Sequence, residues 1–197
     1  ALGATLRHHR DLGFHEVTLA GEYLLVPAAA LAAQERNLQG CRKCKLCEAR
    51  TTIVFGMGNP RAEFVCIGEG PGADEDAQGK PFVGRAGQLL TRMLDSVGLD
   101  RDRDCYICNA VKCRPPANRN PEAGELAACA PFLAAQLGTI QPTVILSLGG
   151  VATQALLGTK EPIGKLRGRL HPYGGAVLIP TFHPAFLLRN PGQENKR

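Results

Sequence analysis

Four of the eight cysteines in this chain have the type and spacing of a metal-cluster site. Cys41 and Cys44 form a C-x2-C pair, Cys113 lies in the segment K-C-R-P-P, and Cys129 follows further along. Thiolate sulfur is a ligand for zinc and for iron–sulfur clusters. The ligands lie far apart in the sequence, unlike the two close C-x2-C pairs of a zinc ribbon, so they would hold an N-terminal segment against a folded domain. The spacing predicts a metal site without naming the metal.

A carboxylate lies in a glycine-rich segment, G-E-G-P-G, at residues 68–72. Glycine lets the backbone approach a ligand closely, and Glu69 would then face that ligand. The segment matches neither the Walker A lysine pattern nor the dinucleotide fingerprint, so a phosphate loop is not predicted. A plain turn between a strand and a helix is the alternative.

Three further residues have side chains suited to recognising a nucleobase. Phe82 lies in G-K-P-F-V-G, where its ring could stack on a base with a contact worth roughly 1–3 kcal/mol. The amide of Asn109 offers a donor and an acceptor side by side, as the edge of a base does. His183 can donate a hydrogen bond to a developing anion. The alternatives are packing for Phe82, a turn for Asn109 and a structural role for His183.

The segment after His183 and the charged loops suit a partner that carries phosphates. Residues 185–191 could push an apolar wedge into stacked DNA while Arg189 holds a phosphate, or they could form one buried helical turn. The formal net charge is +5, a mild basic excess. Several basic loops around one acidic loop predict a phosphate-binding rim, with solvated loops as the alternative. The basic residues are Lys112, Arg114, Arg119, Lys160, Lys165, Arg167 and Arg169.

Alternating strands and helices from residue 63 onward would position these side chains. Strands are predicted at 63–68, 104–111, 143–148 and 176–181, and helices at 86–97, 121–137 and 149–157. The alternation predicts an α/β fold of three α/β/α layers around a central, mostly parallel four-stranded sheet. Ligands of such sheets bind beyond the carboxyl ends of the strands, where Glu69, Asn109 and His183 would meet.

The length of 197 residues fits one domain with an N-terminal appendage. Residues 1–40 are predicted to be an extension, with helical composition at 28–39 and a strand or irregular segment at 16–26, and residues 41–197 the domain. The sequence contains no run of 18 or more apolar residues, so it predicts no membrane span, and the opening residues lack a signal pattern. A cytoplasmic protein is expected, in which eight cysteines more often mean metal ligands and buried thiols than disulfides.

Taken together, the segments resemble the family 4 uracil-DNA glycosylases over residues 41–191. The motifs occur in the family's order: C-x2-C, V-F-G-x-G-N-P, G-E-G-P-G-x-D-E-D, G-K-P-F-V-G-R-A-G-Q-L-L, Y-I-C-N-x-V-K-C-R-P-P-x-N-R, L-R-G and H-P-A-F-L-L-R-N-P. The resemblance implies a monofunctional enzyme of the bacterial or archaeal cytosol. It would flip deoxyuridine out of single- or double-stranded DNA, hydrolyse the N-glycosidic bond, and leave an abasic site and uracil. It also implies a uracil-DNA glycosylase-like fold, a four-iron four-sulfur cluster and a monomer.

The resemblance also implies a role for each matching cysteine. The cluster ligands would be Cys41, Cys44, Cys113 and Cys129, and Cys47, Cys66, Cys105 and Cys108 would be bystanders. Cys47 nevertheless extends the first pair to C-x2-C-x2-C, which looks like part of a ferredoxin ligand run. The cluster would have a structural role and would hold the DNA-binding loops.

In the pocket, the resemblance implies that Phe82 stacks on uracil and that Asn109 reads its Watson–Crick edge. The backbone at Glu69 and Gly70 would complete the pocket, and His183 would hydrogen-bond the uracil anion at O2. Other branches carry an aspartate at the position of Gly70, so Glu69 is the predicted water-activating residue, with Asp74 or Asp76 as the alternative. The DNA-binding residues would be Lys112, Arg114, Arg119, Arg167 and Arg189.

The sequence departs from the family pattern in two places. Cys108 replaces an expected threonine, and the chain stops at Arg197 where the family continues, which predicts a truncated C-terminus.

Two alternative functions fit the sequence less well. A non-enzymatic nucleic-acid-binding protein with zinc in the same cysteines would explain the basic loops but not the polar residues at the strand ends. A related glycosylase that links covalently to DNA needs a histidine-bearing insertion, and none follows residues 84–90.

Overall fold

A computed structural model of the chain describes residues 25–190 and 192. The strands are β1 (Met57–Gly58), β2 (Phe64–Gly68), β3 (Cys105–Asn109), β4 (Val144–Leu148), β5 (His171–Tyr173) and β6 (Ala176–Thr181). The helices are α2 (Leu25–Leu38), α3 (Ala73–Gln78), α4 (Arg85–Ser96), α5 (Ala123–Ile140), α6 (Gly150–Leu157), α7 (Ile163–Leu166) and α8 (Pro184–Arg189), with 3-10 turns η2 (Lys45–Glu48) and η3 (Pro116–Asn118).

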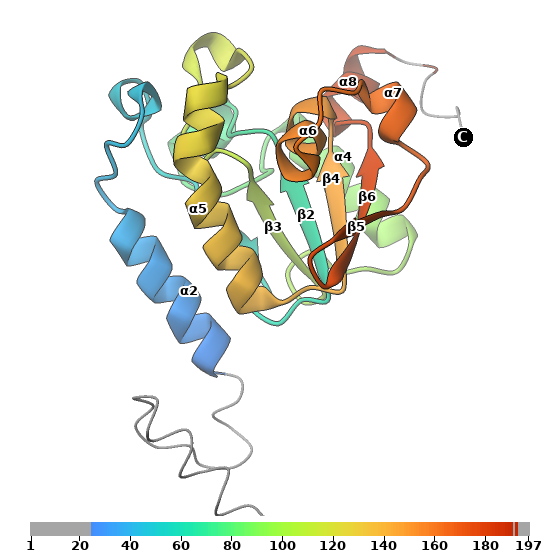
Figure 1. The fold of residues 1–197 in the computed structure, drawn as a ribbon, viewed down its shortest axis with the longest axis horizontal. Coiled ribbons are helices and arrows are strands. Elements are labelled where there is room, and N and C mark those ends of the chain that lie inside the picture. Colours follow the sequence, from blue (N-terminus) through green and yellow to red (C-terminus); the bar gives the residue numbers. More distant parts are fainter. Residues whose placement is uncertain (1–24, 191, 193–197) are drawn as a thin grey trace, which may run out of the picture.

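The six strands form one sheet in the order β1-β3-β2-β4-β6-β5. The four central strands are parallel, and the two edge strands β1 and β5 are antiparallel to their neighbours. Helices α2 and α5 lie in front of the sheet and α4 lies behind it (Figure 1). The predicted three-layer fold with a parallel four-stranded centre is confirmed. The edge strands were missed because two or three residues are too few to show a hydrophobic period.

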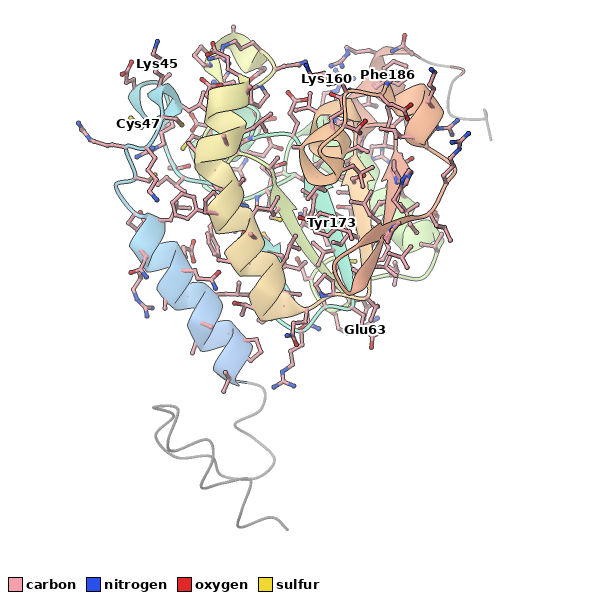
Figure 2. All side chains as sticks on the ribbon, viewed as in Figure 1. Lys45, Cys47, Glu63, Lys160, Tyr173 and Phe186 are labelled. Atoms are coloured by element: carbon pink, nitrogen blue, oxygen red, sulfur yellow. The ribbon has the colours of Figure 1, made fainter. Side chains whose placement is uncertain are left out.

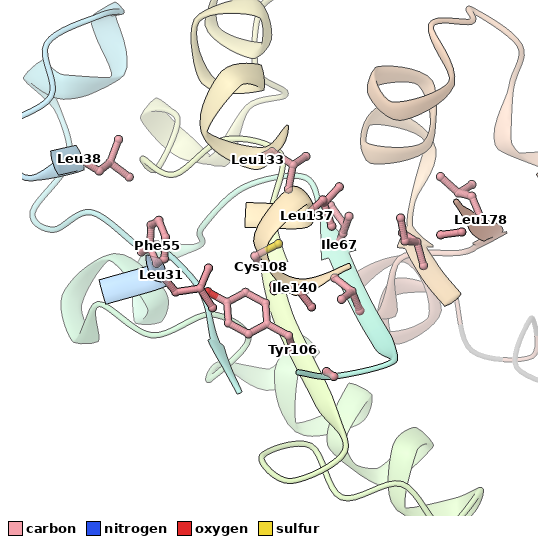
Figure 3. Packing of buried hydrophobic residues seen from close by; sticks show 14 residues of the cluster. Leu31, Leu38, Phe55, Ile67, Tyr106, Cys108, Leu133, Leu137, Ile140 and Leu178 are labelled. Carbon is pink, nitrogen blue, oxygen red and sulfur yellow. The ribbon is translucent and has the colours of Figure 1, made fainter. Parts of the chain in front are cut away.

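Alternate residues of the strands face opposite layers, which builds two apolar cores. On one face, Ile67 and Cys108 share a buried cluster with Leu137 of α5 (Figure 3). On the other face, Cys66 and Ile107 belong to a second cluster together with the buried residues of α4. Burial on both faces is the reason why the central strands read as continuous apolar runs in the sequence.

Helix α2 lies alongside α5 (Figure 1) and confirms the helix predicted at 28–39. Its residues Leu31 and Leu38 are buried in the same cluster as the sheet, so no break in packing coincides with the predicted boundary at residue 40. The predicted strand or irregular segment at 16–26 lies almost entirely outside the described residues.

Helix α5 is, within the part of the chain that the structure describes, the single helix long and apolar enough to cross a membrane. Length and composition alone are weak grounds for a membrane span, because the core helix of a globular domain passes the same test. One side of α5 covers the sheet, and its residue Gln136 is fully buried and hydrogen-bonded to the backbone of Phe55. This packing is that of a core helix.

The strand order brings four strand ends to one place. Strand β2 lies between β3 and β4 in the sheet. At such a point the loop after one strand turns away from the loops after its neighbours, which leaves a crevice at the carboxyl ends of the strands. In register, Gly68 lies opposite Asn109, and Leu148 lies opposite Thr181. The segments that follow these residues are therefore neighbours, as the sequence predicts.

Candidate active site

A cavity of about 660 Å³ opens beyond the carboxyl ends of the parallel strands. Its volume falls in the range of small-molecule sites. The predicted residues that line it are Glu69, Gly70, Phe82, Asn109, Arg119, His183 and Arg189. The backbone that follows β4, at Gly149 and Gly150, also lines it. The structure thus brings together residues from four separate strand ends.

Asn109 presents an unsatisfied hydrogen-bond acceptor inside the protein. Its side chain is 1% exposed, and its Oδ1 atom is one of two buried side-chain polar atoms that lack a partner among the described residues. Gly68 leaves the room for this amide, because a Cβ there would lie 2.5 Å from Asn109 Oδ1 and 2.5 Å from Phe82 Cζ. Buried polar atoms normally have partners, so an unpaired acceptor in a cavity suits a ligand that donates a hydrogen bond.

The prediction that Lys112 contacts DNA is wrong, because its side chain is fully buried. Its Nζ atom donates to the backbone carbonyl of Asn109 at 2.8 Å and to the side-chain oxygen of Gln136. Gln136 in turn donates to the carbonyl of Phe55 and to the Tyr106 hydroxyl. Lys112 therefore fixes the end of β3, and with it the backbone that carries the Asn109 amide.

Phe82 is held in a strained backbone conformation beside the cavity. Its φ of 53° lies in the left-handed region, which costs a non-glycine residue on the order of 1–3 kcal/mol, and strained residues of this kind cluster at functional sites. The ring is 5% exposed and stacks on the imidazole of His183, with 5.6 Å between the ring centroids and 29° between the planes. In this backbone conformation, the aromatic ring of Phe82 forms part of the cavity wall.

Two charged side chains hold the Phe82 loop in this conformation. Arg101 donates to the carbonyl of Phe82 at 2.9 Å and to that of Pro81 at 3.1 Å. Glu75 accepts hydrogen bonds from the backbone N–H groups of Val83 and Gly84, both at 2.9 Å. Sequence reasoning missed Arg101, because its partners are carbonyls that carry no side-chain signal.

His183 is fixed in one tautomer by the helix that it caps. Its Nδ1 atom accepts a hydrogen bond from the backbone N–H of Ala185 at 3.1 Å, so the proton of the neutral ring resides on Nε2. Burial, with a smaller contribution from Arg189, lowers the pKa of His183 from 6.5 to about 4. The histidine is therefore a neutral N–H donor at physiological pH.

Among the three candidate water-activating carboxylates, Glu69 is the one that lines the cavity. Burial raises its pKa above the ordinary value of 4.5, and the nearby Arg189 opposes the shift. Asp76 is 3% exposed and accepts hydrogen bonds from the backbone N–H groups of Thr51 and Thr52, so it joins α3 to a neighbouring loop. Asp74 is exposed and lies outside the lining.

The other basic residues predicted to bind DNA divide into two groups. Arg119 and Arg189 line the cavity, and Arg119 forms a bidentate ion pair with Glu125 at 2.7 and 2.8 Å. Arg114 and Arg167 lie outside the lining and are half-buried. The guanidinium of Arg167 lies 4.4 Å from the ring centroid of Phe182, a residue of the cavity wall.

The four cysteines predicted as ligands converge on a second, smaller cavity. It is lined by Cys41, Cys44, Cys113 and Cys129, and by a fifth cysteine, Cys47. Figure 2 labels Cys47 in the segment between α2 and the sheet. The sequence could not show this convergence, because these cysteines come from η2 and its flanking loop, from the loop after β3, and from α5.

The chemistry of this donor set suits an iron–sulfur cluster. All the candidate ligands are thiols, and Arg50 donates to Cys113 Sγ at 3.3 Å, a cation beside ligands that are negatively charged when deprotonated. Zinc requires its ligands to close tetrahedrally on one point. Among the described residues no group of three or more Cys, His, Asp or Glu does so. Five thiols from three segments line this one small cavity, and thiolates are the ligands that bind iron–sulfur clusters.

Comparisons with known proteins agree with this geometry. The family model described as "Uracil DNA glycosylase superfamily" matches residues 55–197. The chain is 50% identical to the type-4 uracil-DNA glycosylase of Thermotoga maritima, over 82% of this chain and 84% of that protein. It is 48% identical to the type-4 enzyme of Saccharolobus solfataricus, over 79% of this chain and 76% of that protein. The chain therefore belongs to the type-4 family of the uracil-DNA glycosylase superfamily.

Proposed function

We propose that the protein is a monofunctional uracil-DNA glycosylase of base excision repair. It takes deoxyuridine out of the DNA stack, hydrolyses the N-glycosidic bond, and leaves uracil and an abasic site. The unpaired Oδ1 of Asn109 carries this proposal. Uracil has an N–H donor at N3 beside the O4 acceptor, so N3–H can donate to Asn109 Oδ1 while the amide nitrogen donates to O4. Cytosine has an acceptor at N3, which would face Asn109 Oδ1 without a hydrogen bond.

The residues around Asn109 supply the remaining contacts to the flipped base. Phe82 stacks on the ring of uracil, and the backbone at Glu69 and Gly70 closes the pocket around its edge. His183 donates from Nε2 to O2 of uracil as negative charge develops on the leaving base. A neutral donor suits this role because the ring proton stays on the enzyme.

Glu69 is the residue proposed to activate the attacking water. We expect Glu69→Gln to lower the yield of abasic sites per unit time by about 10²-fold, a common contribution of a general base. Single-turnover cleavage of a uracil-containing oligonucleotide measures the effect. The matched control is Asp74→Asn, which removes an exposed carboxylate outside the cavity and should retain activity. Full activity in Glu69→Gln would exclude this assignment.

The pH dependence of kcat/KM should follow Glu69 and not His183. Activity falls as the pH decreases through the pKa of Glu69, which lies above 4.5, because the base must be deprotonated. His183 stays neutral until the pH reaches about 4, so it adds no inflection near its ordinary value of 6.5. The acid limb should therefore disappear in Glu69→Gln. An inflection near pH 6.5 that persists in this variant would contradict the pKa assigned to His183.

The DNA partner, its strand form and the location of the protein follow from the same proposal. Arg119 and Arg189 at the cavity, and Arg114 and Arg167 beside it, would bind the phosphates around the flipped nucleotide. Single- and double-stranded uracil DNA both suit such a rim, and we propose a monomer in the bacterial or archaeal cytosol.

Substitution of these four arginines should weaken DNA binding uniformly across DNA sequences and reduce the salt dependence of the binding constant.

A four-iron four-sulfur cluster is proposed at the cysteine cavity, with Cys41, Cys44, Cys113 and Cys129 as ligands. When bound, the cluster would cross-link the segment after α2, the loop after β3 and helix α5. Hydrolysis of a glycosidic bond transfers no electrons, so this structural role suffices. The proposal is supported by the all-thiol lining and by Arg50 beside Cys113. Iron and acid-labile sulfide in the purified protein would test it.

One assay tests the proposed function. The protein is incubated with an oligonucleotide that contains one uracil, and abasic sites are then cleaved with alkali. We expect cleavage at the uracil. We expect no cleavage of an oligonucleotide that has thymine or cytosine at the same position. DNA binding without cleavage, by a protein that contains zinc, would instead support the non-enzymatic alternative. A complex that resists denaturing gel conditions would support a covalent enzyme.

A further inference from the structure

The cavity proposed to hold the cluster has one more thiol than a cluster needs. Five of the chain's eight cysteines line it, and the fifth is Cys47. The remaining three, Cys66, Cys105 and Cys108, are fully buried in the central strands and belong to the apolar cores. Cys47 is therefore the single cysteine of this chain that faces the site without a role there.

Local backbone geometry places Cys47 next to one particular ligand. Cys44 is the N-terminal cap of the 3-10 turn η2, and the backbone N–H of Cys47 donates to the carbonyl of Cys44 at 3.2 Å. A 3-10 helix has three residues per turn, so residues i and i+3 lie on the same side. Cys44 precedes the turn in an extended conformation and Cys47 is the third residue of the turn, and both line the same cavity.

The packing around η2 holds this pair at the cavity. Leu46, between the two cysteines, is fully buried in a cluster that also contains Cys113 and Cys129. Cys44 and Cys47 are both half-buried, whereas Cys113 and Cys129 are each only 6% exposed. Cys44 and Cys47 therefore both lie on the more open side of the site.

We propose that Cys47 is a reserve ligand that can replace Cys44 on the cluster. The inference rests on the proposed cluster. With Cys44 lost or blocked, the Cys47 thiol would give its proton to solvent, and its thiolate would serve as the fourth ligand in place of Cys44. The cap of η2 supplies one thiol and the turn itself the other, so the exchange would leave Cys41, Cys113 and Cys129 in place. The C-x2-C-x2-C segment could thus supply its second cluster ligand from either Cys44 or Cys47.

The test compares iron and acid-labile sulfide per chain in anaerobically purified wild type, Cys44→Ser, Cys47→Ser, the double variant of these two, and Cys113→Ser. We expect Cys44→Ser and Cys47→Ser to retain most of the iron, and the double variant and Cys113→Ser to have several-fold less. Iron loss in Cys44→Ser equal to that in Cys113→Ser overturns the proposal. Retention in the double variant also overturns it, because three ligands would then suffice.

Alkylation with iodoacetamide, read by mass spectrometry, reports the ligand directly, because a thiolate bound to iron is protected. Cys47 should react in the wild type and be protected in Cys44→Ser, and reaction in both overturns the proposal. If Cys44→Ser does not fold, the proposal is tested instead by the rate at which a chelator removes iron from Cys47→Ser and from wild type. Release several-fold faster from Cys47→Ser than from wild type is expected, and an equal rate overturns the proposal. Wild type without iron or sulfide would instead refute the proposed cluster itself.

Discussion

Replacement of His183 by asparagine should lower kcat on a uracil-containing oligonucleotide by about 10²- to 10³-fold, the usual cost of removing one preorganised donor to a developing anion. Asparagine still offers an oxygen to the backbone N–H of Ala185, so the cap of α8 is retained while the Nε2 donor is lost. The KM should change little, because the lost hydrogen bond strengthens only as the bond to the sugar breaks. Single-turnover and steady-state kinetics measure both constants.

His171→Asn is the matched control for this substitution. His171 lies in the edge strand β5, outside the lining of the cavity, and contacts the carbonyl of Leu166. The control variant should keep wild-type kcat. A kcat for His183→Asn within a few-fold of wild type, in a protein of unchanged stability, would contradict the role of His183 as the donor to the leaving base.

Replacement of Asn109 by leucine should abolish most activity and at the same time stabilise the protein. The buried edge of uracil would lose both partners, which lowers kcat/KM by about 10²-fold or more. The free protein would lose its unpaired Oδ1 atom, and removal of such a buried orphan raises the free energy of unfolding by roughly 1 kcal/mol. Opposite changes in activity and stability mark a residue that is retained for a ligand.

Cleavage kinetics and urea denaturation measure the two effects of Asn109→Leu. The matched control is Asn59→Leu, because the Asn59 amide has a partner at both ends: it donates to the carbonyl of Arg103 and accepts from the backbone N–H of Arg61. The control should lose stability and retain activity. Lower stability in Asn109→Leu would show that its amide has a structural partner in the free protein and would remove the main support for the proposed base contact.

Much of the fold and the site could be predicted from the sequence, because the signals are local. The apolar runs of the central strands and the period of α4 gave the parallel sheet with helices on both faces. Asn109 is the last residue of β3, Glu69 and His183 come just after β2 and β6, and parallel strands end at one edge. Their convergence on one cavity therefore followed from topology alone.

Lys112 shows where this local reasoning failed. A lysine in a short basic run reads as a solvated residue that can bind phosphate, yet it is fully buried and holds the end of β3. Its partner Gln136 lies on α5, and no local pattern connects the two residues. Arg101 was missed for the same reason, since it binds carbonyl groups of a distant loop.

By itself, the sequence determined the layers of the fold, the strand ends whose residues line the cavity, and the four cysteines that could hold a metal. Those features depend on residue type and on spacing along the chain. Only the tertiary structure decided the orientation and partners of each group. It showed an acceptor left unpaired on Asn109, a single tautomer of His183, and a fifth thiol at the cysteine cavity. Hydrogen bonding and burial depend on neighbours in space, which a one-dimensional pattern does not record.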